Sequence, residues 1–172
     1  AMAEEEGRRR GCANVMLCGA SGRNVASFIP AGSGLQVVNG CAPNDNTRAM
    51  LVTRNGIGNV AGPALQSYLE RGGIVIGEYN INHTLFNLAF GTNVARGAAN
   101  GSCMDAVMPA VQQNPLDAFW QANRFAAPAQ NATGCGFDVT AFPNITRLGG
   151  WTANTTSLAY RDRNAGRVWL VE

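Results

Sequence analysis

The side chains that most often perform acid–base or covalent chemistry are scarce in this 172-residue chain. It has a single histidine, His83, and no lysine. Without lysine, Schiff-base chemistry, the P-loop phosphate site and the Tyr-Lys pair of short-chain dehydrogenases are excluded. Any Ser-His-Asp or Cys-His device, and any metal site that uses histidine, would depend on His83. The sequence therefore predicts no metal site and no cofactor.

The cysteines are odd in number and lie at positions 12, 18, 41, 103 and 135. No CxxC spacing occurs, so we expect neither a zinc ribbon nor a thioredoxin-like site. Cys18 follows an apolar run and is expected to be a buried thiol at a strand end. Cys103 and Cys135 lie in loop-like GSCMD and GCGFD stretches, where we expect a disulfide. That bond, with the asparagine-rich composition, favours an extracytoplasmic or secreted protein.

Two groups of polar and glycine residues follow neighbouring predicted strands. Glu78 and His83 are the candidate acid–base pair. The residues expected to bind a ligand are Asn55, Gly56, Gly58, Asn59, Tyr79 and Asn80. In open α/β sheets ligands bind in the crevice beyond the carboxyl ends of the strands. Structural roles stay open for Glu78, as a helix-capping carboxylate, and for His83, as a hydrogen-bonded structural histidine.

Short, continuous apolar runs predict buried strands near residues 15–18, 35–38, 49–53 and 74–77. Such runs are typical of a parallel sheet covered on both faces. A helix is predicted from about Pro63 to Gly72, and another, capped by Asn80 or Asn82, ends at Gly91. The sequence therefore predicts a three-layer, mostly parallel, flavodoxin-like α/β fold with helices on both faces.

The rest of the chain is less regular. We expect residues 1–11 to be a disordered leader or a cloning remnant, and residues 12–172 to form one domain. Residues 92–150 are expected to be a loop-rich excursion, with a helix capped by Asn114 and a short strand near residues 137–140. Residues 157–161 and 167–171 flank a turn and predict a C-terminal β-hairpin.

Charge and hydropathy exclude several partner classes. The net charge of +2 comes partly from the arginine run at residues 8–10, and no basic face with interleaved aromatic residues occurs elsewhere. The sequence therefore predicts no nucleic-acid binding. No run of 18 apolar residues is present, so no membrane span is expected.

The segment AMLVTRNGIGNVAGPALQSYLERGGIVIGEYNINHTLFNLAFG resembles the central stretch of class I glutamine amidotransferase-like proteins. The closing SLAYRDRNAGRVWLVE resembles the final hairpin of the ThuA-like branch. The resemblance implies a nucleophile elbow after the fourth strand. The position of the family's catalytic cysteine falls on or beside Tyr79, and residues 141–172 contain no histidine. The resemblance thus implies a site without its Cys-His pair.

The turn GASGRN after the first strand resembles part of a Rossmann fingerprint, but Val25 occupies the third glycine position. The second strand ends in Asn39 rather than in an acid that would hold a ribose. We therefore expect a tight strand-to-helix turn rather than a dinucleotide site.

Three functions stay open. The favoured one is a diverged, non-catalytic amidotransferase-like domain that binds a small polar ligand or a partner protein. The first alternative is a ThuA-like hydrolase or isomerase that acts on a carbohydrate-type substrate with Glu78 and His83 as acid and base. The second alternative is a structural or assembly module. The oligomeric state is not predicted by any pattern in the sequence.

Overall fold

The computed structural model describes residues 14–19, 24–78, 81–95, 103–104, 111–122, 134–150 and 155–171. The predicted leader lies outside these residues, and so do Tyr79, Asn80 and most of the GASGRN turn.

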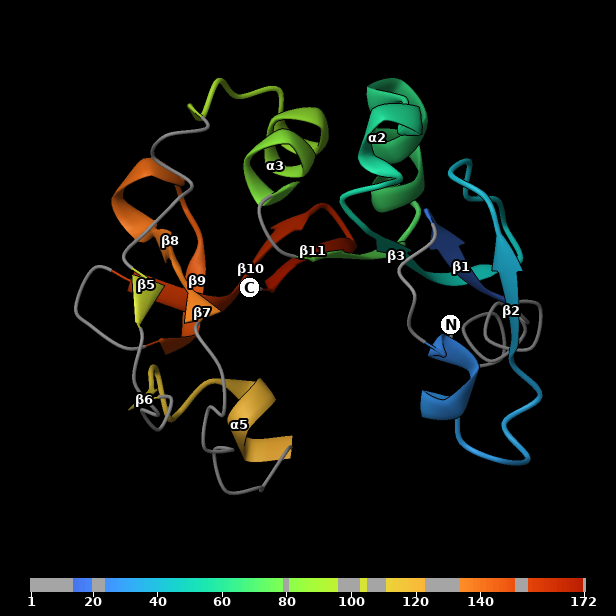
Figure 1. Ribbon diagram of the computed structural model, residues 1–172, viewed down its shortest axis with the longest axis horizontal. Helices are drawn as coiled ribbons and strands as arrows, with labels where there is room; N and C mark the ends of the chain where they lie inside the picture. The colour runs from blue at the N-terminus through green and yellow to red at the C-terminus, as the bar shows by residue number, and fades with distance from the viewer. Residues whose placement is uncertain are drawn as a thin grey trace.

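The centre of the molecule is a parallel sheet with the strand order β2-β1-β3-β4-β11 (Figure 1). Its strands are β1 (Asn14–Cys18), β2 (Gln36–Asn39), β3 (Thr47–Val52), β4 (Ile74–Glu78) and β11 (Gly166–Val171). Each neighbouring pair along this order is parallel. The four strands predicted from apolar runs are all present, and the expected α/β class is confirmed.

Beyond β11 the sheet continues with antiparallel strands. The hairpin partner β10 (Thr155–Arg163) pairs with β11, and β9 (Thr146–Gly150) pairs with β10. The predicted C-terminal hairpin is therefore confirmed, and Asn164 turns it with a φ of 50°. Glycine adopts such a left-handed backbone conformation most readily, and asparagine is among the residues that adopt it next most readily.

The predicted excursion contributes several short elements. Two of them extend the sheet: β6 (Val111–Gln112) pairs with β9, and β8 (Phe137–Asp138) pairs with β10. The 3-10 turn η4 (Val139–Ala141) follows β8, so the predicted strand near 137–140 is shorter than expected. A separate two-stranded sheet joins β5 (Cys103–Met104) to β7 (Gly134–Cys135).

The helices α2 (Gly62–Glu70) and α3 (Asn82–Phe90) begin and end near the predicted residues. Pro63 lies in the first turn of α2, and Gly91 ends α3 with a left-handed φ of 64°. The predicted cap of α3 is wrong, because the N-cap residue is Ile81 and no side chain caps the helix. Asn82 is instead buried, and its amide donates a hydrogen bond of 3.1 Å to the carbonyl oxygen of Val171.

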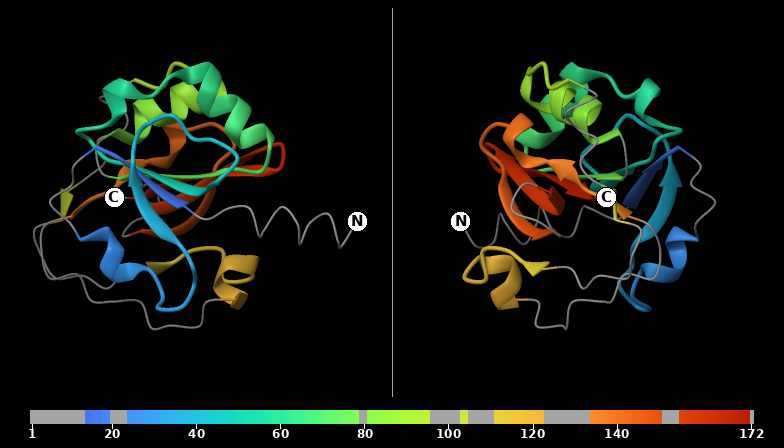
Figure 2. Two further views of the ribbon diagram at one scale, coloured as in Figure 1. Left: turned by 90° about the vertical axis from the view of Figure 1, so that its right-hand side faces the viewer. Right: turned by 60° about the vertical axis from the view of Figure 1, so that its left-hand side comes forward.

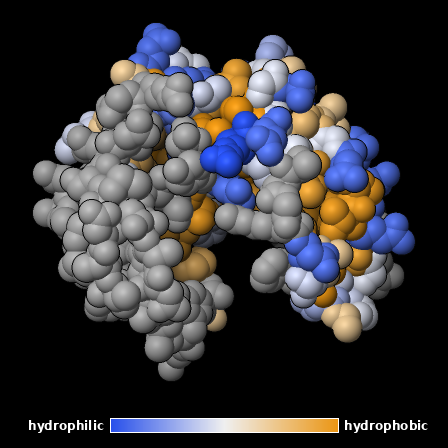
Figure 3. Space-filling view, in the orientation of Figure 1, coloured by the Kyte–Doolittle hydropathy of each residue, from blue (hydrophilic) through white to orange (hydrophobic). Residues whose placement is uncertain are grey.

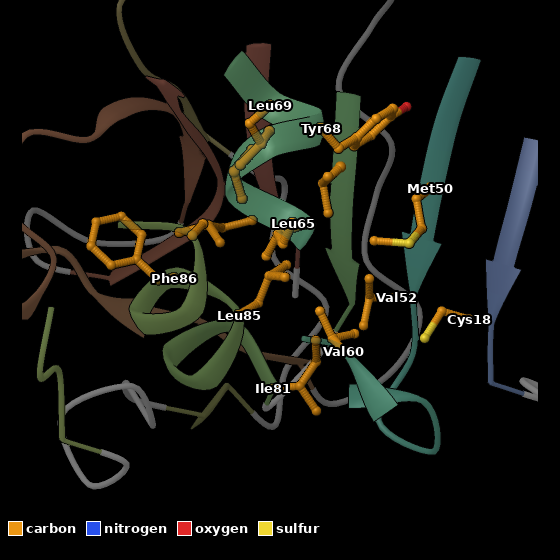
Figure 4. Close-up of a cluster of buried hydrophobic side chains, with 14 of the residues drawn as sticks. Cys18, Met50, Val52, Val60, Leu65, Tyr68, Leu69, Ile81, Leu85 and Phe86 are labelled. Atoms are coloured by element: carbon orange, nitrogen blue, oxygen red, sulfur yellow. The ribbon is translucent and has the colours of Figure 1, made fainter. Parts of the chain in front are cut away.

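The core lies between these two helices and one face of the sheet (Figure 4). Leu65 and Leu69 of α2 and Leu85 and Phe86 of α3 are fully buried. They pack with alternate residues of the strands, among them Met50, Val52, Val75, Val168 and Leu170. Burial of each such side chain stabilises the fold by about 1.5–3 kcal/mol.

The opposite face of the sheet is covered less completely. The side chains that alternate with the core residues on the central strands, among them Leu51, Ile76 and Trp169, are only half-buried. The 3-10 turn η1 (Val25–Phe28) and the short helix α5 (Ala118–Ala122) lie on this side (Figure 2). In the orientation of Figure 1, the described part of the surface shows hydrophobic patches between hydrophilic side chains (Figure 3). In the described part of the chain, the two longer helices α2 and α3 cover the same face of the sheet (Figure 2).

The start of α5 also differs from the prediction. Asn114 adopts a left-handed φ of 50° and does not cap the helix. The carboxylate of Asp117 accepts a 2.9 Å hydrogen bond from the backbone N–H of Phe119, so Asp117 caps the first turn. Asn114 instead donates its amide to the carbonyl oxygen of Arg147 at 2.7 Å, which ties this turn to β9.

Candidate functional site

The carboxyl ends of the parallel strands bring the two predicted groups of site residues to one edge of the sheet. Strands β3 and β4 are neighbours, with Val52 paired to Gly77. The turn that holds Asn55 and Asn59 follows β3, and Glu78 ends β4. The predicted ligand-binding and acid–base residues therefore share this edge, except that Tyr79 and Asn80 lie outside the described residues.

The turns that follow β1 and β3 are in direct backbone contact. Gly56 lies so close to β1 that a Cβ atom on it would lie 2.0 Å from the carbonyl oxygen of Cys18. That same oxygen accepts hydrogen bonds from the backbone N–H and the hydroxyl of buried Thr53, at 3.0 and 3.2 Å. Gly56, predicted as a ligand-binding residue, is thus buried and holds two turns together.

A disulfide between Cys18 and Cys41 joins the ends of β1 and β2. Leu17 of β1 pairs with Asn39 of β2 in parallel register. The residues that follow each strand are therefore close in space, and the Cα atoms of Cys18 and Cys41 lie 4.7 Å apart. The prediction that Cys18 is a buried residue at a strand end is confirmed, but it is bonded rather than a free thiol. The Sγ atom of Cys18 also lies 3.3 Å from the carbonyl oxygen of Gly56, which brings the disulfide against the turn after β3.

The backbone N–H groups of the turn after β3 are largely used within the turn. Gly56 and Ile57 donate to the carbonyl oxygen of Thr53, and Asn59 and Val60 donate within the 3-10 turn η2 (Ile57–Asn59). These four N–H groups cannot form an oxyanion hole or a phosphate cradle, because each already has a backbone acceptor. A ligand at this turn would instead meet exposed side chains.

The exposed residues of the turn are Arg54, Asn55, Gly58 and Asn59. A Cβ atom added to Gly58 would meet no atom within 4 Å, so the space over this residue is open. Each asparagine amide supplies both hydrogen-bond donors and an acceptor. With the charged guanidinium of Arg54 beside the two asparagines, this surface offers hydrogen-bond donors and acceptors to a polar group.

Glu78 ends β4, and His83 lies in the first turn of α3. Glu78 is half-buried and is paired in the sheet with Val171. His83 is half-buried in the first turn of α3, and its Nε2 atom lies 3.0 Å from the hydroxyl of Thr84. The imidazole is thus held by a residue of its own helix. Among the described residues no group of three His, Cys, Asp or Glu side chains is arranged to hold a metal ion.

A second polar cluster, absent from the sequence prediction, lies between α5 and the C-terminal hairpin. The hydroxyl of Tyr160 donates a 2.7 Å hydrogen bond to the carboxylate of Asp117. This bond lowers the pKa of Asp117, with smaller effects from the N–H of Phe119 and from Arg167, while burial opposes them. Burial raises the pKa of Tyr160, and its bond to Asp117 raises it further.

Arg167 completes this second cluster. Its guanidinium lies 3.7 Å from the centre of the Tyr160 ring and makes hydrogen bonds of 2.7 and 3.2 Å to Asp162. The bond to Asp162 raises the pKa of Arg167. An open depression of about 380 Å³ lies beside the cluster, lined by residues 114–117. Leu116 at its rim is 89% exposed.

One signal in the sequence would have revealed this second cluster. Tyr160 and Trp169 stand at positions that pair across the hairpin, as do Asp162 and Arg167, so each pair shares a face. Cross-strand aromatic and opposite-charge pairs of this kind stabilise hairpins by about 0.2–1 kcal/mol each. The sequence gives no comparable indication that Asp117 contacts Tyr160, because the two residues lie far apart in the chain.

Comparisons with known proteins do not assign the chain to a family: no protein-family model matches it, and a search of characterised proteins finds no significant match. None of the helices in the described ranges has the length and apolar character needed to cross a membrane.

Proposed function

We propose that this chain is a non-catalytic, amidotransferase-like binding domain that holds a small polar ligand at the turn after β3. We propose an amidotransferase-like domain because the sequence around this turn resembles that of class I glutamine amidotransferase-like proteins. The observation that carries the binding role is the joined set of turns at the ends of β1, β2 and β3, which presents Asn55 and Asn59 on a rigid base.

The strand order supports the proposed flavodoxin-like arrangement. The order β2-β1-β3-β4-β11 follows the pattern 2-1-3-4-5 when its strands are numbered along the chain. In that pattern the connections leave in opposite directions from the first and third strands, and ligands bind at this switch point. In this chain the switch point lies between β1 and β3, and the turn that holds Gly56 contacts β1 there.

The chemistry of the edge supports binding rather than amide hydrolysis. A cysteine nucleophile must be a thiolate, and both Cys18 and Cys41 at this edge are in a disulfide. The four turn amides that would stabilise an oxyanion are already bonded within the turn. His83 lies near β4 rather than near the C-terminus, where the family keeps its catalytic histidine.

The buried disulfide is also compatible with an extracytoplasmic or secreted location. Disulfides persist in oxidising compartments, and cytosolic thiol pools reduce most of them. We include this location in the proposal because Cys18 is fully buried, and its bond therefore has a structural rather than a transient role.

The test is a titration of the oxidised protein, uniformly labelled with ¹⁵N, with a panel of uncharged monosaccharides, disaccharides and acyclic polyols. We expect at least one of them to shift the side-chain amide signals of Asn55 and Asn59. The double variant Asn55→Ala/Asn59→Ala should weaken the binding about five- to 150-fold, since each lost hydrogen bond costs about 0.5–1.5 kcal/mol.

The matched control is Asn46→Ala. Asn46 is an exposed asparagine in the turn before β3, at the opposite end of the strand from the proposed site. It should bind like the wild type. Shifts confined to other surfaces, or equal affinity in the double variant, would overturn the proposed site. The absence of binding by the whole panel would favour a structural or assembly module.

A further inference from the structure

We infer that Cys103 and Cys135 form a second disulfide, which closes the loop between them at its base. The two residues belong to the short strands β5 and β7, which come from distant parts of the chain. Their antiparallel pairing places Cys103 directly opposite Cys135, and Met104 opposite Gly134.

The backbone register fits the geometry of a disulfide. Directly opposite residues of an antiparallel pair share a face of the ribbon and have Cα atoms about 4.5–5.5 Å apart. Disulfide bonds join residues whose Cα atoms lie about 4.4–6.8 Å apart. Cys103 and Cys135 would therefore need no movement of the backbone to become bonded.

The small size of the ribbon gives the bond a structural purpose. β5 and β7 pair through two residue pairs and form a sheet of their own. Isolated two-stranded pairings are marginal in water, and pairing distant segments costs loop-closure entropy. A covalent link removes that cost by restricting the unfolded chain. A disulfide would therefore stabilise the pairing of β5 with β7.

The count of cysteines agrees with this pairing. With Cys18 bonded to Cys41, the remaining cysteines are Cys12, Cys103 and Cys135. A bond between the two that face each other leaves Cys12 as the single free thiol. The loop-like stretches around both residues predicted this pairing, and the register of β5 and β7 places the two residues opposite each other.

The reaction is a thiol–disulfide exchange. A protein or small-molecule disulfide accepts the two electrons: one thiolate attacks it to give a mixed disulfide, and the second thiolate then displaces the reduced thiol. Two thiols of the chain lose their protons and become one S–S bond, while the oxidant becomes two thiols. An oxidant of this class is also needed for the bond between Cys18 and Cys41.

The closed loop carries the depression lined by residues 114–117. The loop is already attached to the main sheet through the pairing of β6 with β9. The indole N–H of Trp120 adds hydrogen bonds to the carbonyl oxygens of Gln113 and Leu148, at 2.9 and 3.1 Å. The second disulfide would join the two strands at which this segment of the chain begins and ends.

Peptide mapping of the full chain tests the inference. The protein is oxidised with a glutathione redox pair, denatured without reductant, alkylated with iodoacetamide and digested with trypsin. Cleavage after arginine gives separate peptides for Cys103, residues 97–124, and for Cys135, residues 125–147. We expect these two peptides as one disulfide-linked species, with alkylation confined to Cys12.

Cys12 and Cys18 fall on the same tryptic peptide, so its fragmentation spectrum must place the alkyl group on Cys12. Two variants complete the test. Cys12→Ser should lower the count of free thiols from one to zero, and Cys103→Ser should raise it from one to two by releasing Cys135. Alkylation of both Cys103 and Cys135 in the oxidised wild type, or a link from either to Cys12, would overturn the inference.

Discussion

Gly19 and Gly56 lie in backbone contact at the carboxyl edge of the sheet. A Cβ atom on Gly19 would lie 2.4 Å from the backbone nitrogen of Gly56, and one on Gly56 would lie 2.7 Å from the backbone nitrogen of Gly19. Gly19 also has a left-handed φ of 95°, which few other residues adopt. The contact brings the chain after β1 against the turn after β3, and it can exist only between glycines.

Gly56→Ala should destabilise the protein by more than about 2 kcal/mol, because the new methyl group collides with backbone rather than with a movable side chain. Urea unfolding followed by circular dichroism measures the change. The matched control is Gly58→Ala in the same turn, where a Cβ atom meets nothing within 4 Å. It should change stability by less than about 0.5 kcal/mol. Equal effects of the two substitutions would show that the turns are not packed in this way.

Loss of the Cys18–Cys41 disulfide should cost about 3 kcal/mol, given the sequence separation of 23 residues. The double variant Cys18→Ser/Cys41→Ser should therefore unfold at lower urea concentration than the oxidised wild type. In a Cys103→Ser/Cys135→Ser background, reductant should lower the stability of the protein that keeps Cys18 and Cys41, and it should leave that of the Cys18→Ser/Cys41→Ser variant unchanged. If reductant destabilises both proteins equally, the stabilising bond lies elsewhere.

Tyr160→Phe should raise the pKa of Asp117 toward its ordinary value, since the hydroxyl of Tyr160 is the main cause that lowers it. Carbon-detected NMR titration of the Asp117 carboxylate measures this shift. The control Tyr68→Phe removes a hydroxyl that bonds the carbonyl oxygen of Thr47, on the other side of the sheet. It should leave the pKa of Asp117 unchanged.

The same bond gives a pH dependence of stability with a definite sign. Because the pKa of Asp117 is lower in the folded protein, its contribution is present above the ordinary pKa of aspartate and is lost as the pH falls through the folded value. The pKa of Tyr160 is raised, so its contribution is present below the ordinary pKa of tyrosine and is lost as the pH rises through the folded value. The wild type should therefore exceed Tyr160→Phe in stability most clearly near pH 7. A difference that grows toward pH 2 would contradict this assignment.

The parts of the fold that the sequence predicts are those with local causes. Continuous apolar runs identify β1 to β4, because short apolar runs bounded by turn residues are typical of strands in parallel sheets. Pro63 and Gly91 mark the start of α2 and the end of α3 through their backbone preferences. The edge location of Asn55 and Glu78 follows from the parallel order alone.

The parts that the sequence does not predict depend on contacts between distant segments. Cys18 finds Cys41 only because β1 and β2 are parallel neighbours, and spacing alone does not reveal a disulfide partner. β9 has two glycines and no apolar alternation, and it is a strand because β10 and β6 flank it. Asn82 has the sequence signature of a helix cap, but its amide is used to hold the end of β11.

The last prediction separates binding from catalysis. If the chain is a binding domain, Glu78→Gln/His83→Asn should leave its affinity for the ligand within about threefold, because the proposed contacts come from Asn55 and Asn59. The backbone N–H groups of Gly56, Ile57, Asn59 and Val60 donate to backbone oxygens of the turn itself, so the turn should keep its shape.

The measurement pairs the ¹⁵N titration with assays for hydrolysis and isomerisation of the same carbohydrates. We expect no turnover by the wild type above the buffer rate, and an unchanged spectrum for the turn in the double variant. Turnover by the wild type that falls at least a hundredfold in the double variant, with the melting temperature preserved, would replace the binding proposal. It would assign acid–base roles to Glu78 and His83, since removal of a general acid or base typically costs about 10²–10⁴ in rate.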